Sequence, residues 1–290
     1  MNPPTKNGRK DTTAKGSEEA LDRYLEREAL TKRIARIGRT ILILSGKGGV
    51  GKSTVAANLA VALAQAGRTV GLLDVDIHGP SVPKLLGLEG RTPTSTGQSI
   101  HPIEYDSRLK VMSIGFVLGG RDDAVIWRGP LKMNVIKQFL KDVEWGDLDF
   151  LVVDCPPGTG DEPLSVAQLI GKPDGAVIVT TPQDLAISDV RKCVSFCREL
   201  DLPVLGVIEN MSGFVCPHCG GAVDIFKSGG GEAMAADMGV PFLGRIPIDP
   251  ELVQASDRGE LYLQTQAKSE TAAAFRDAIM PVLNMKRRAQ

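Results

Sequence analysis

The sequence lacks a long apolar run and an excess of charge of either sign. No hydrophobic stretch approaches the roughly 20 residues that a membrane-spanning helix needs, and the N-terminus has no apolar signal-peptide core. Lys and Arg number 34 against 35 Asp and Glu, so charge does not predict nucleic-acid binding. The five cysteines are odd in number, which argues against a disulfide framework. We therefore expect a cytoplasmic protein with no stable membrane insertion and no nucleic-acid partner.

The chain has enough apolar sequence for one large core, with 42% hydrophobic residues and a net charge of -1. We expect residues 1–37 to form a polar tail and a loose leading helix, and residues 38–290 to form one domain. Short apolar runs alternate with helical patterns, and 89–98 is expected to be a loop. The predicted strands are 40–44, 69–75, 150–154, 175–180, 204–210 and 242–246. This alternation predicts an α/β fold with a doubly wound, mostly parallel sheet.

Residues 46–53 read GKGGVGKS, a phosphate-binding loop with an extra lysine after its first glycine. An apolar run precedes the loop and a helical pattern over 53–63 follows it, which is the context that the motif requires. Glycines let backbone amides surround a phosphate, and the helix N-terminus adds partial positive charge. We expect Lys52 to meet the β- and γ-phosphates and Ser53 to bind Mg²⁺. The nucleotide-binding residues predicted here are Gly46, Lys47, Gly48, Gly49, Val50, Gly51, Lys52, Ser53 and Thr54.

Polar residues end several of the predicted strands, where open α/β sheets bind their ligands. Asp154 ends an apolar strand and is expected to hold Mg²⁺ directly or through water. Gly158 follows shortly after, and its amide is a candidate for γ-phosphate binding. Asp74 and Asp76 follow another strand, although one of them could instead cap a helix that begins near residue 81.

Cys216 and Cys219 lie two residues apart in the segment 214–221. Thiolates at this spacing can chelate one soft metal, and a four-ligand site would need a second copy of the chain in a two-fold dimer. Four thiolates suit either an iron-sulfur cluster or Zn²⁺, and a redox-active pair is a further alternative. Cys155, Cys193 and Cys197 are expected to be buried thiols.

The extra lysine, Lys47, resembles the deviant Walker A signature of the MinD, ParA and nitrogenase iron-protein class. With the segments 74–81, 154–161 and 210–219, the chain over about residues 38–285 resembles the Mrp/ApbC family of iron-sulfur cluster carrier ATPases. The resemblance implies a P-loop fold and an ATP-dependent homodimer in which Lys47 reaches the phosphates of the partner. It implies that Asp76 orients or activates the attacking water and that Asp74 supports the Mg²⁺ shell, with Lys47, Lys52 and Asp76 as the catalytic residues.

The same resemblance implies that Asn210, Pro247 and Asp249 contact the adenine. It implies that Cys216 and Cys219 of two subunits hold a [4Fe-4S] cluster that passes to apo-proteins, and it leaves room for scaffold or donor proteins. The alternative is a positioning ATPase of the MinD or ParA type in which a four-cysteine zinc site only locks the dimer. Neither positioning class needs the cysteine pair, so the carrier hypothesis is favoured.

Overall fold

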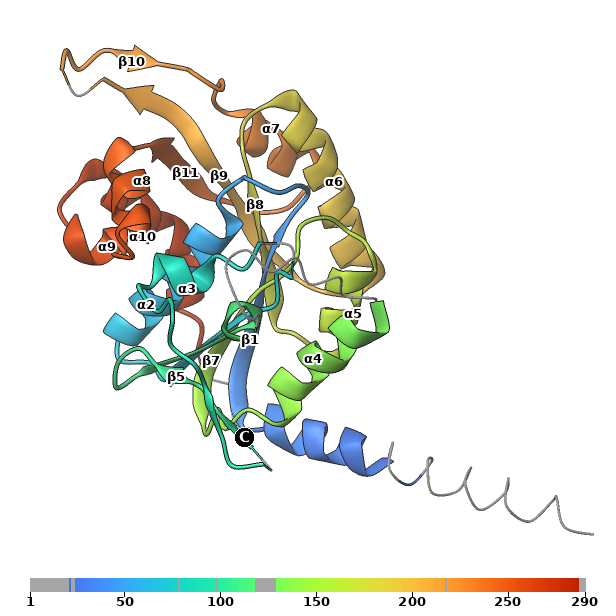
Figure 1. The fold of residues 1–290 in the computed structure, drawn as a ribbon. Coiled ribbons are helices and arrows are strands. Elements are labelled where there is room, and N and C mark those ends of the chain that lie inside the picture. The colour runs from blue at the N-terminus through green and yellow to red at the C-terminus, as the bar shows by residue number, and fades with distance from the viewer. Residues whose placement is uncertain are drawn as a thin grey trace, which may run out of the picture.

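The computed structural model describes residues 21, 24–77, 79–97, 99–117, 129–216 and 218–286, with the backbone alone for 129–132. Its centre is a nine-stranded sheet in the order β10-β9-β8-β1-β7-β2-β6-β5, with β11 also beside β9 (Figure 1). The parallel strands are β1 (Ile37–Ser45), β2 (Val70–Asp74), β6 (Leu109–Ser113), β7 (Leu148–Asp154), β8 (Gly175–Thr180), β9 (Val204–Val215) and β11 (Phe242–Ile248). Two short strands, β5 (Ile103–Glu104) and β10 (Ala222–Val223), pair antiparallel at the edges.

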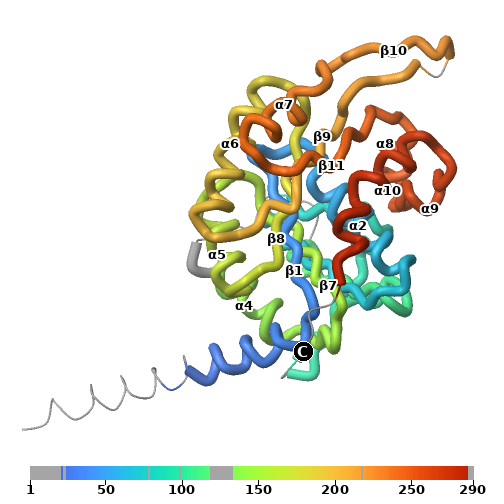
Figure 2. The backbone as a smooth tube through the Cα atoms, turned by 180° about the vertical axis from the view of Figure 1, so that it is seen from behind, coloured from blue at the N-terminus to red at the C-terminus, as the bar shows by residue number. Residues whose placement is uncertain are grey.

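Helices cover both faces of this sheet (Figures 1 and 2). One face carries α2 (Lys52–Gln65), α3 (Val82–Leu85), α8 (Pro250–Asp257), α9 (Tyr262–Thr265) and α10 (Glu270–Leu283). The other face carries α4 (Gly129–Lys141), α5 (Asp161–Ile170), α6 (Asp184–Glu199) and α7 (Gly230–Asp237). A short 3₁₀ helix, η1, spans Ile114–Phe116. In the described part of the chain no helix combines the length and the apolar character that a membrane span requires.

The central strand β1 shows why the predicted α/β fold forms. Ile41 and Ile43 lie in the core under α2, while Leu42 and Leu44 lie in the core on the opposite face. Because successive side chains of a strand point to opposite faces, a strand covered on both sides must be apolar at every position. The doubly wound sheet is therefore confirmed, and it places β1 between β7 and β8 at the point where ligands bind in such folds.

The polar edge of the sheet differs from the sequence prediction. Strand β6 was not predicted, because Lys110 interrupts its apolar run and sends its ammonium to the carbonyl of Trp145, 2.9 Å away. The expected loop over 89–98 contains strand β3 (Thr94–Ser95), which pairs with β4 (Ile100–His101), so that part of the prediction is wrong. Short polar strands carry little hydrophobic periodicity, which is why the sequence does not reveal them.

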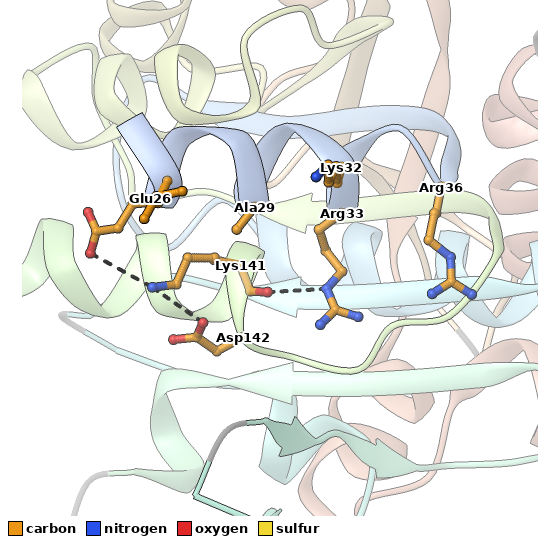
Figure 3. A pocket seen from close by; sticks show the side chains of 8 residues that line it. Glu26, Ala29, Lys32, Arg33, Arg36, Lys141 and Asp142 are labelled. Carbon is orange, nitrogen blue, oxygen red and sulfur yellow. Dashed lines mark hydrogen bonds and ion pairs between the residues drawn. The ribbon is translucent and has the colours of Figure 1, made fainter. Parts of the chain in front are cut away.

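Residues 24–34 form a leading helix that lies against the end of α4 (Figure 3). The guanidinium of Arg33 donates to both carboxylate oxygens of Glu144 at 2.8 and 3.0 Å, and its Nε donates to the carbonyl of Lys141 at 3.1 Å. Lys137 also pairs with Glu26. A groove of about 550 Å³ runs along this contact. Long-range ion pairs therefore hold the helix, and the predicted tail before residue 21 lies outside the described residues.

Candidate functional site

The phosphate-binding loop joins the end of β1 to the start of α2 at the switch point of the sheet. Gly49 and Gly51 have φ values of +78° and +84°, which residues with a Cβ rarely adopt. Gly51 is the N-cap of α2 and, as a glycine, has no side chain with which to cap the helix. The amides of the first turn therefore remain available for an anion, as the sequence predicts. Ser45 donates its hydroxyl to the carbonyl of Lys47 at 3.0 Å and so steadies the start of the loop.

A pocket of about 480 Å³ lies over this loop, a volume in the usual range for ligand sites. Among the described residues its lining is Ser45, Lys47, Gly48, Gly49, Gly51, Lys52, Ser53, Thr54, Asp76, Gly79, Ser81, Pro157 and Met211. Two predicted loop residues instead serve the scaffold. Val50 is buried in the core, and a Cβ on Gly46 would lie 2.6 Å from the backbone of Asp189 on α6. The loop therefore both surrounds the pocket and packs against its neighbours.

One buried ammonium serves the carboxylates at the strand ends. The Nζ of Lys52 lies 2.6 Å from Oδ1 of Asp154 and 3.4 Å from Oδ2 of Asp76. Burial alone would lower the pKa of Lys52, but Asp154 and Asp76 outweigh it and raise the pKa. Burial raises the pKa of Asp154, even with the attraction of Lys52. Among the described residues, the charges of Asp154, Asp76 and Asp74 thus all act on this one ammonium.

The remaining oxygen of Asp154 shows what this cluster fits. Within the described residues, Oδ2 of Asp154 is buried and has no hydrogen-bond partner. A buried polar atom without a partner costs free energy, and a carboxylate oxygen is a preferred ligand of Mg²⁺ or of its bound waters. The orphaned oxygen and the excess of negative charge therefore fit Mg²⁺ together with the predicted phosphate ligand, with Ser53 beside them in the pocket lining.

Asp74 supports the site from beneath. Its Oδ1 accepts from the amide of Asp76 at 3.0 Å, and its Oδ2 accepts from the hydroxyl of Ser113 at 2.8 Å and the amide of Val82 at 3.4 Å. Burial, and then the charge of Asp154, raise the pKa of Asp74 to about 7. The bond from Val82 agrees with the alternative expectation that one of the two aspartates caps the helix near residue 81. The support of Mg²⁺ by Asp74 stays a prediction. Ser113 was not foreseen because its strand, β6, was not.

The predicted γ-phosphate and base contacts have protein partners in the structure. The amide of Gly158 donates to the carbonyl of Ser45 at 2.8 Å. The side-chain Nδ2 of Asn210 donates to the carbonyl of Val50 at 2.9 Å, so this side chain contacts and supports the phosphate-binding loop. Asp249 caps α8 by accepting from the amide of Glu251 at 2.9 Å. The predicted adenine contacts therefore stay predictions.

The described pocket lining includes residues that were not predicted as site residues, Met211 among them, and the predicted base contacts lie outside this lining. Met211 lines the pocket with a φ of +56°, a strained value for a residue with a side chain. Pro247 lies in β11 and, like Asp249, is not among the described lining residues. No local sequence signal marks Met211, because its position is set by two contacts of its neighbours, that of Asn210 with Val50 and that of Ser212 with Glu209.

The cysteine pair lies at the end of a projecting hairpin (Figures 1 and 2). Strand β9 runs past the end of β8 and pairs with β10, and the turn between them is closed by two hydrogen bonds. The amide of Cys216 donates to the carbonyl of Gly221 at 3.0 Å, and the amide of Gly220 donates to the carbonyl of Cys216 at 2.9 Å. Cys219 is exposed and Cys216 partly so. Hydrogen bonds from the amides of His218 and Cys219 lower the pKa of Cys216 and favour the thiolate that binds metal.

The other three cysteines are buried, as the sequence predicts. Burial raises the pKa of Cys193 and of Cys197 to about 12, and it raises the pKa of Cys155 further. A neutral thiol is a poor nucleophile and a poor metal ligand. The described thiols therefore divide into a reactive pair at the hairpin and an inert set in the core.

The fold and the phosphate-binding loop, with its extra lysine, define a P-loop nucleotide hydrolase of the MinD and ParA type. The chain belongs to the NUBPL iron-transfer P-loop NTPase family, whose model matches residues 36–283. The family and the fold class that the sequence predicts are thereby confirmed.

Curated relatives and solved structures agree with this family. The cytosolic Fe-S cluster assembly factor NUBP2 homolog of Monosiga brevicollis is 51% identical over 264 residues, which are 89% of this chain and 93% of the relative. The homolog of Dictyostelium discoideum is 50% identical over 248 residues, 84% of this chain and 94% of the relative. A nucleotide-binding protein of Archaeoglobus fulgidus, solved with ADP, has a TM-score of 0.72 and 42% identity, and covers 81% of this chain and 92% of its own. The cell division ATPase MinD of Pyrococcus furiosus has a TM-score of 0.61 and 26% identity, with coverage of 84% and 98%.

Proposed function

We propose that this chain is an ATP-dependent carrier of iron-sulfur clusters that works in the cytosol as a homodimer. The curated relatives are named as cytosolic Fe-S cluster assembly factors, and the family is named for iron transfer. The observation that carries the proposal is the placement of Cys216 and Cys219 on an exposed hairpin that continues strand β9, the strand that also contacts the phosphate-binding loop through Asn210.

The cargo is a [4Fe-4S] cluster held by the cysteine pairs of two copies of the chain. One chain offers two accessible thiols at the hairpin, and a cluster of this kind takes four thiolates. A two-fold axis supplies the second pair. An apo-protein with its own free thiolates can then replace these ligands one at a time and take the cluster. Because the hairpin projects from the domain, a recipient can approach it without touching the nucleotide pocket.

The nucleotide is ATP, bound with its phosphates over the loop between β1 and α2. Lys52 neutralises the β- and γ-phosphates, and Lys47 extends from the lining toward the phosphates of the partner subunit. Mg²⁺, held by Ser53 and Asp154, would offset the charge that develops on the phosphate oxygens. Asp76 lines the pocket and orients the water that attacks the γ-phosphorus, which breaks the bond to the β-phosphate oxygen and gives ADP and phosphate.

The catalytic part of this proposal is tested with Asp76→Asn. This variant keeps the size of the side chain and the loop amides that bind the phosphates. We expect ATP hydrolysis to fall by about 100-fold or more, as for the loss of a group that assists proton transfer, while ATP binding persists. Turnover is followed by phosphate release and binding by calorimetry. Hydrolysis at the parent rate would remove Asp76 from the mechanism.

The cargo is tested by measuring iron, acid-labile sulfide and zinc after anaerobic reconstitution. We expect about four iron and four sulfide per dimer in the parent protein. The metal should be lost in Cys216→Ala with Cys219→Ala and kept in Cys193→Ala, whose thiol is buried. Stoichiometric zinc without iron would contradict the carrier proposal and favour a nucleotide hydrolase whose cysteines only lock a dimer.

A further inference from the structure

Glu209 is a buried carboxylate at the carboxyl end of the part of β9 that pairs with β8. Its exposed fraction is 0%, and it accepts hydrogen bonds from the hydroxyl of Ser212 at 2.5 Å, from the amide of Gly229 at 2.8 Å and from the amide of Gly231. The Nε of Arg245 lies 3.7 Å away. A buried charge is tolerated only when donors surround it, so this acid is fixed in place by its partners.

The partners of Glu209 lie on both sides of the cysteine hairpin. Ser212 precedes the hairpin, whereas Gly229 follows it at the start of α7. The carboxylate therefore closes the base of a loop whose far end carries the two cysteines. The site is built closely, because a Cβ on Gly231 would lie 2.9 Å from Oε2 of Glu209. An acid at a helix N-terminus is also favoured by the helix dipole.

The next two residues of the strand contact the phosphate-binding loop or line the nucleotide pocket. Asn210 donates to the carbonyl of Val50, and a Cβ on Gly51 would lie 2.1 Å from its amide nitrogen. Met211 lines the pocket in its strained conformation. Met211 thus lies between two anchors, the contact of Asn210 with the phosphate-binding loop and the bond of Ser212 to Glu209. The phosphate-binding loop and the carboxylate that closes the hairpin are therefore joined by four consecutive residues of one strand, Glu209 to Ser212.

We propose that Glu209 is the positioning residue that ties the cysteine hairpin to the phosphate-binding loop, so that nucleotide binding orders the hairpin. The proposal rests on the proposed function and adds the route by which the two ends of the molecule communicate. It requires no contact between Glu209 and the nucleotide or the cluster. Coupling of this kind is reciprocal, so an ordered hairpin also favours nucleotide binding.

The test is Glu209→Gln, studied by amide hydrogen exchange with and without Mg-ADP. Glutamine keeps the shape of the side chain, removes its charge and places an NH₂ donor against amide donors. We expect Mg-ADP to slow exchange of the segments 212–216 and 222–231 by about five-fold or more in the parent protein. In the variant these segments should exchange about ten-fold faster than in the parent and should no longer respond to Mg-ADP, since hydrogen bonds to a charged group are lost.

Glu232→Gln is the matched control. Glu232 lies on α7 and also pairs with Arg245, but its side chain is 53% exposed. This variant should behave as the parent. If Glu209→Gln does not fold, Ser212→Ala removes one donor alone and should change hairpin exchange in the same direction by a smaller factor.

Three outcomes would overturn the proposal: a parent hairpin that does not respond to Mg-ADP, a variant that keeps the response, or faster exchange spread equally over β1 and α2. The last pattern is that of a general loss of stability. The iron and sulfide content of the parent tests the proposed function separately, because hydrogen exchange is measured on the protein without a cluster.

Discussion

Lys52→Met should destabilise the protein strongly even without nucleotide. The ammonium of Lys52 pairs with Asp154 and with Asp76, whose side chains are 0% and 12% exposed. Removing one partner of a buried ion pair costs about 3–5 kcal/mol, because the other charge stays buried. For a domain of this size that loss corresponds to a fall in Tm of about 10 °C. Methionine keeps the length of the side chain, so packing changes little.

The assay is urea unfolding followed by circular dichroism, in EDTA at pH 8, for Lys52→Met, Asp154→Asn and the double variant. The double variant should recover part of the loss, with a coupling energy of about 2 kcal/mol. The pKa of Asp154 is raised by burial, so the folded state binds the proton more tightly than the unfolded state. Stability of Lys52→Met should therefore rise as the pH falls from 8 toward 5. The argument would be refuted if Lys52→Met lowered the free energy of unfolding by less than about 1 kcal/mol, or if the effects of the two single variants simply added in the double variant.

The other predictions concern the loop, the leading helix and the thiols. Gly51→Ala should lower stability by about 2 kcal/mol or more and prevent nucleotide binding, because its φ is +84° and a Cβ would lie 2.1 Å from Nδ2 of Asn210. Gly48→Ala should leave stability unchanged, since a Cβ there meets nothing within 4 Å. Arg33→Ala should lower stability by about 1–2 kcal/mol and expose the leading helix to proteolysis, whereas Lys32→Ala, which breaks an exposed pair, should leave stability unchanged. Iodoacetamide at pH 8 should label Cys216 within the native protein and label the buried thiols only after unfolding; native labelling of α6 would contradict this.

The sequence predicted the parts of the fold whose chemistry is local. The central parts of β1 (41–44) and β7 (150–153) are apolar at every position because they are covered on both faces, and the phosphate-binding loop follows β1 directly. Strand β6, next to the edge strand β5, carries Lys110 at its second position, so its pattern does not stand out. Because β6 was not predicted, Ser113 was missed as well, although its hydroxyl donates to Asp74 on the neighbouring strand β2.

The contacts that the sequence did not predict join residues far apart in the chain. Asn210 was expected to contact the adenine, and in the structure its side-chain amide donates to the carbonyl of Val50, 160 residues earlier in the chain. Glu209 ends an apolar run and looks like any polar residue at the end of a strand, because the donors that make its burial tolerable come from a helix 20 residues later. Ion pairs of the leading helix span about a hundred residues in the same way. Residue types are visible in a sequence, whereas the partners that decide their roles are supplied by the fold.

The length of β9 has a consequence for how such a protein can change. Twelve fully extended residues would reach at most about 40 Å, twice the span of the six-residue neighbour β8, and the positive φ values of Met211 and Gly213 shorten this reach. The part of β9 beyond β8 still carries the metal-binding turn past the central strands, where the described residues 218–226 are all exposed and belong to neither core cluster. The sequence of the turn can therefore be replaced, in evolution or by engineering, while the nucleotide-binding domain is kept, provided that Glu209 at the base of the hairpin is retained.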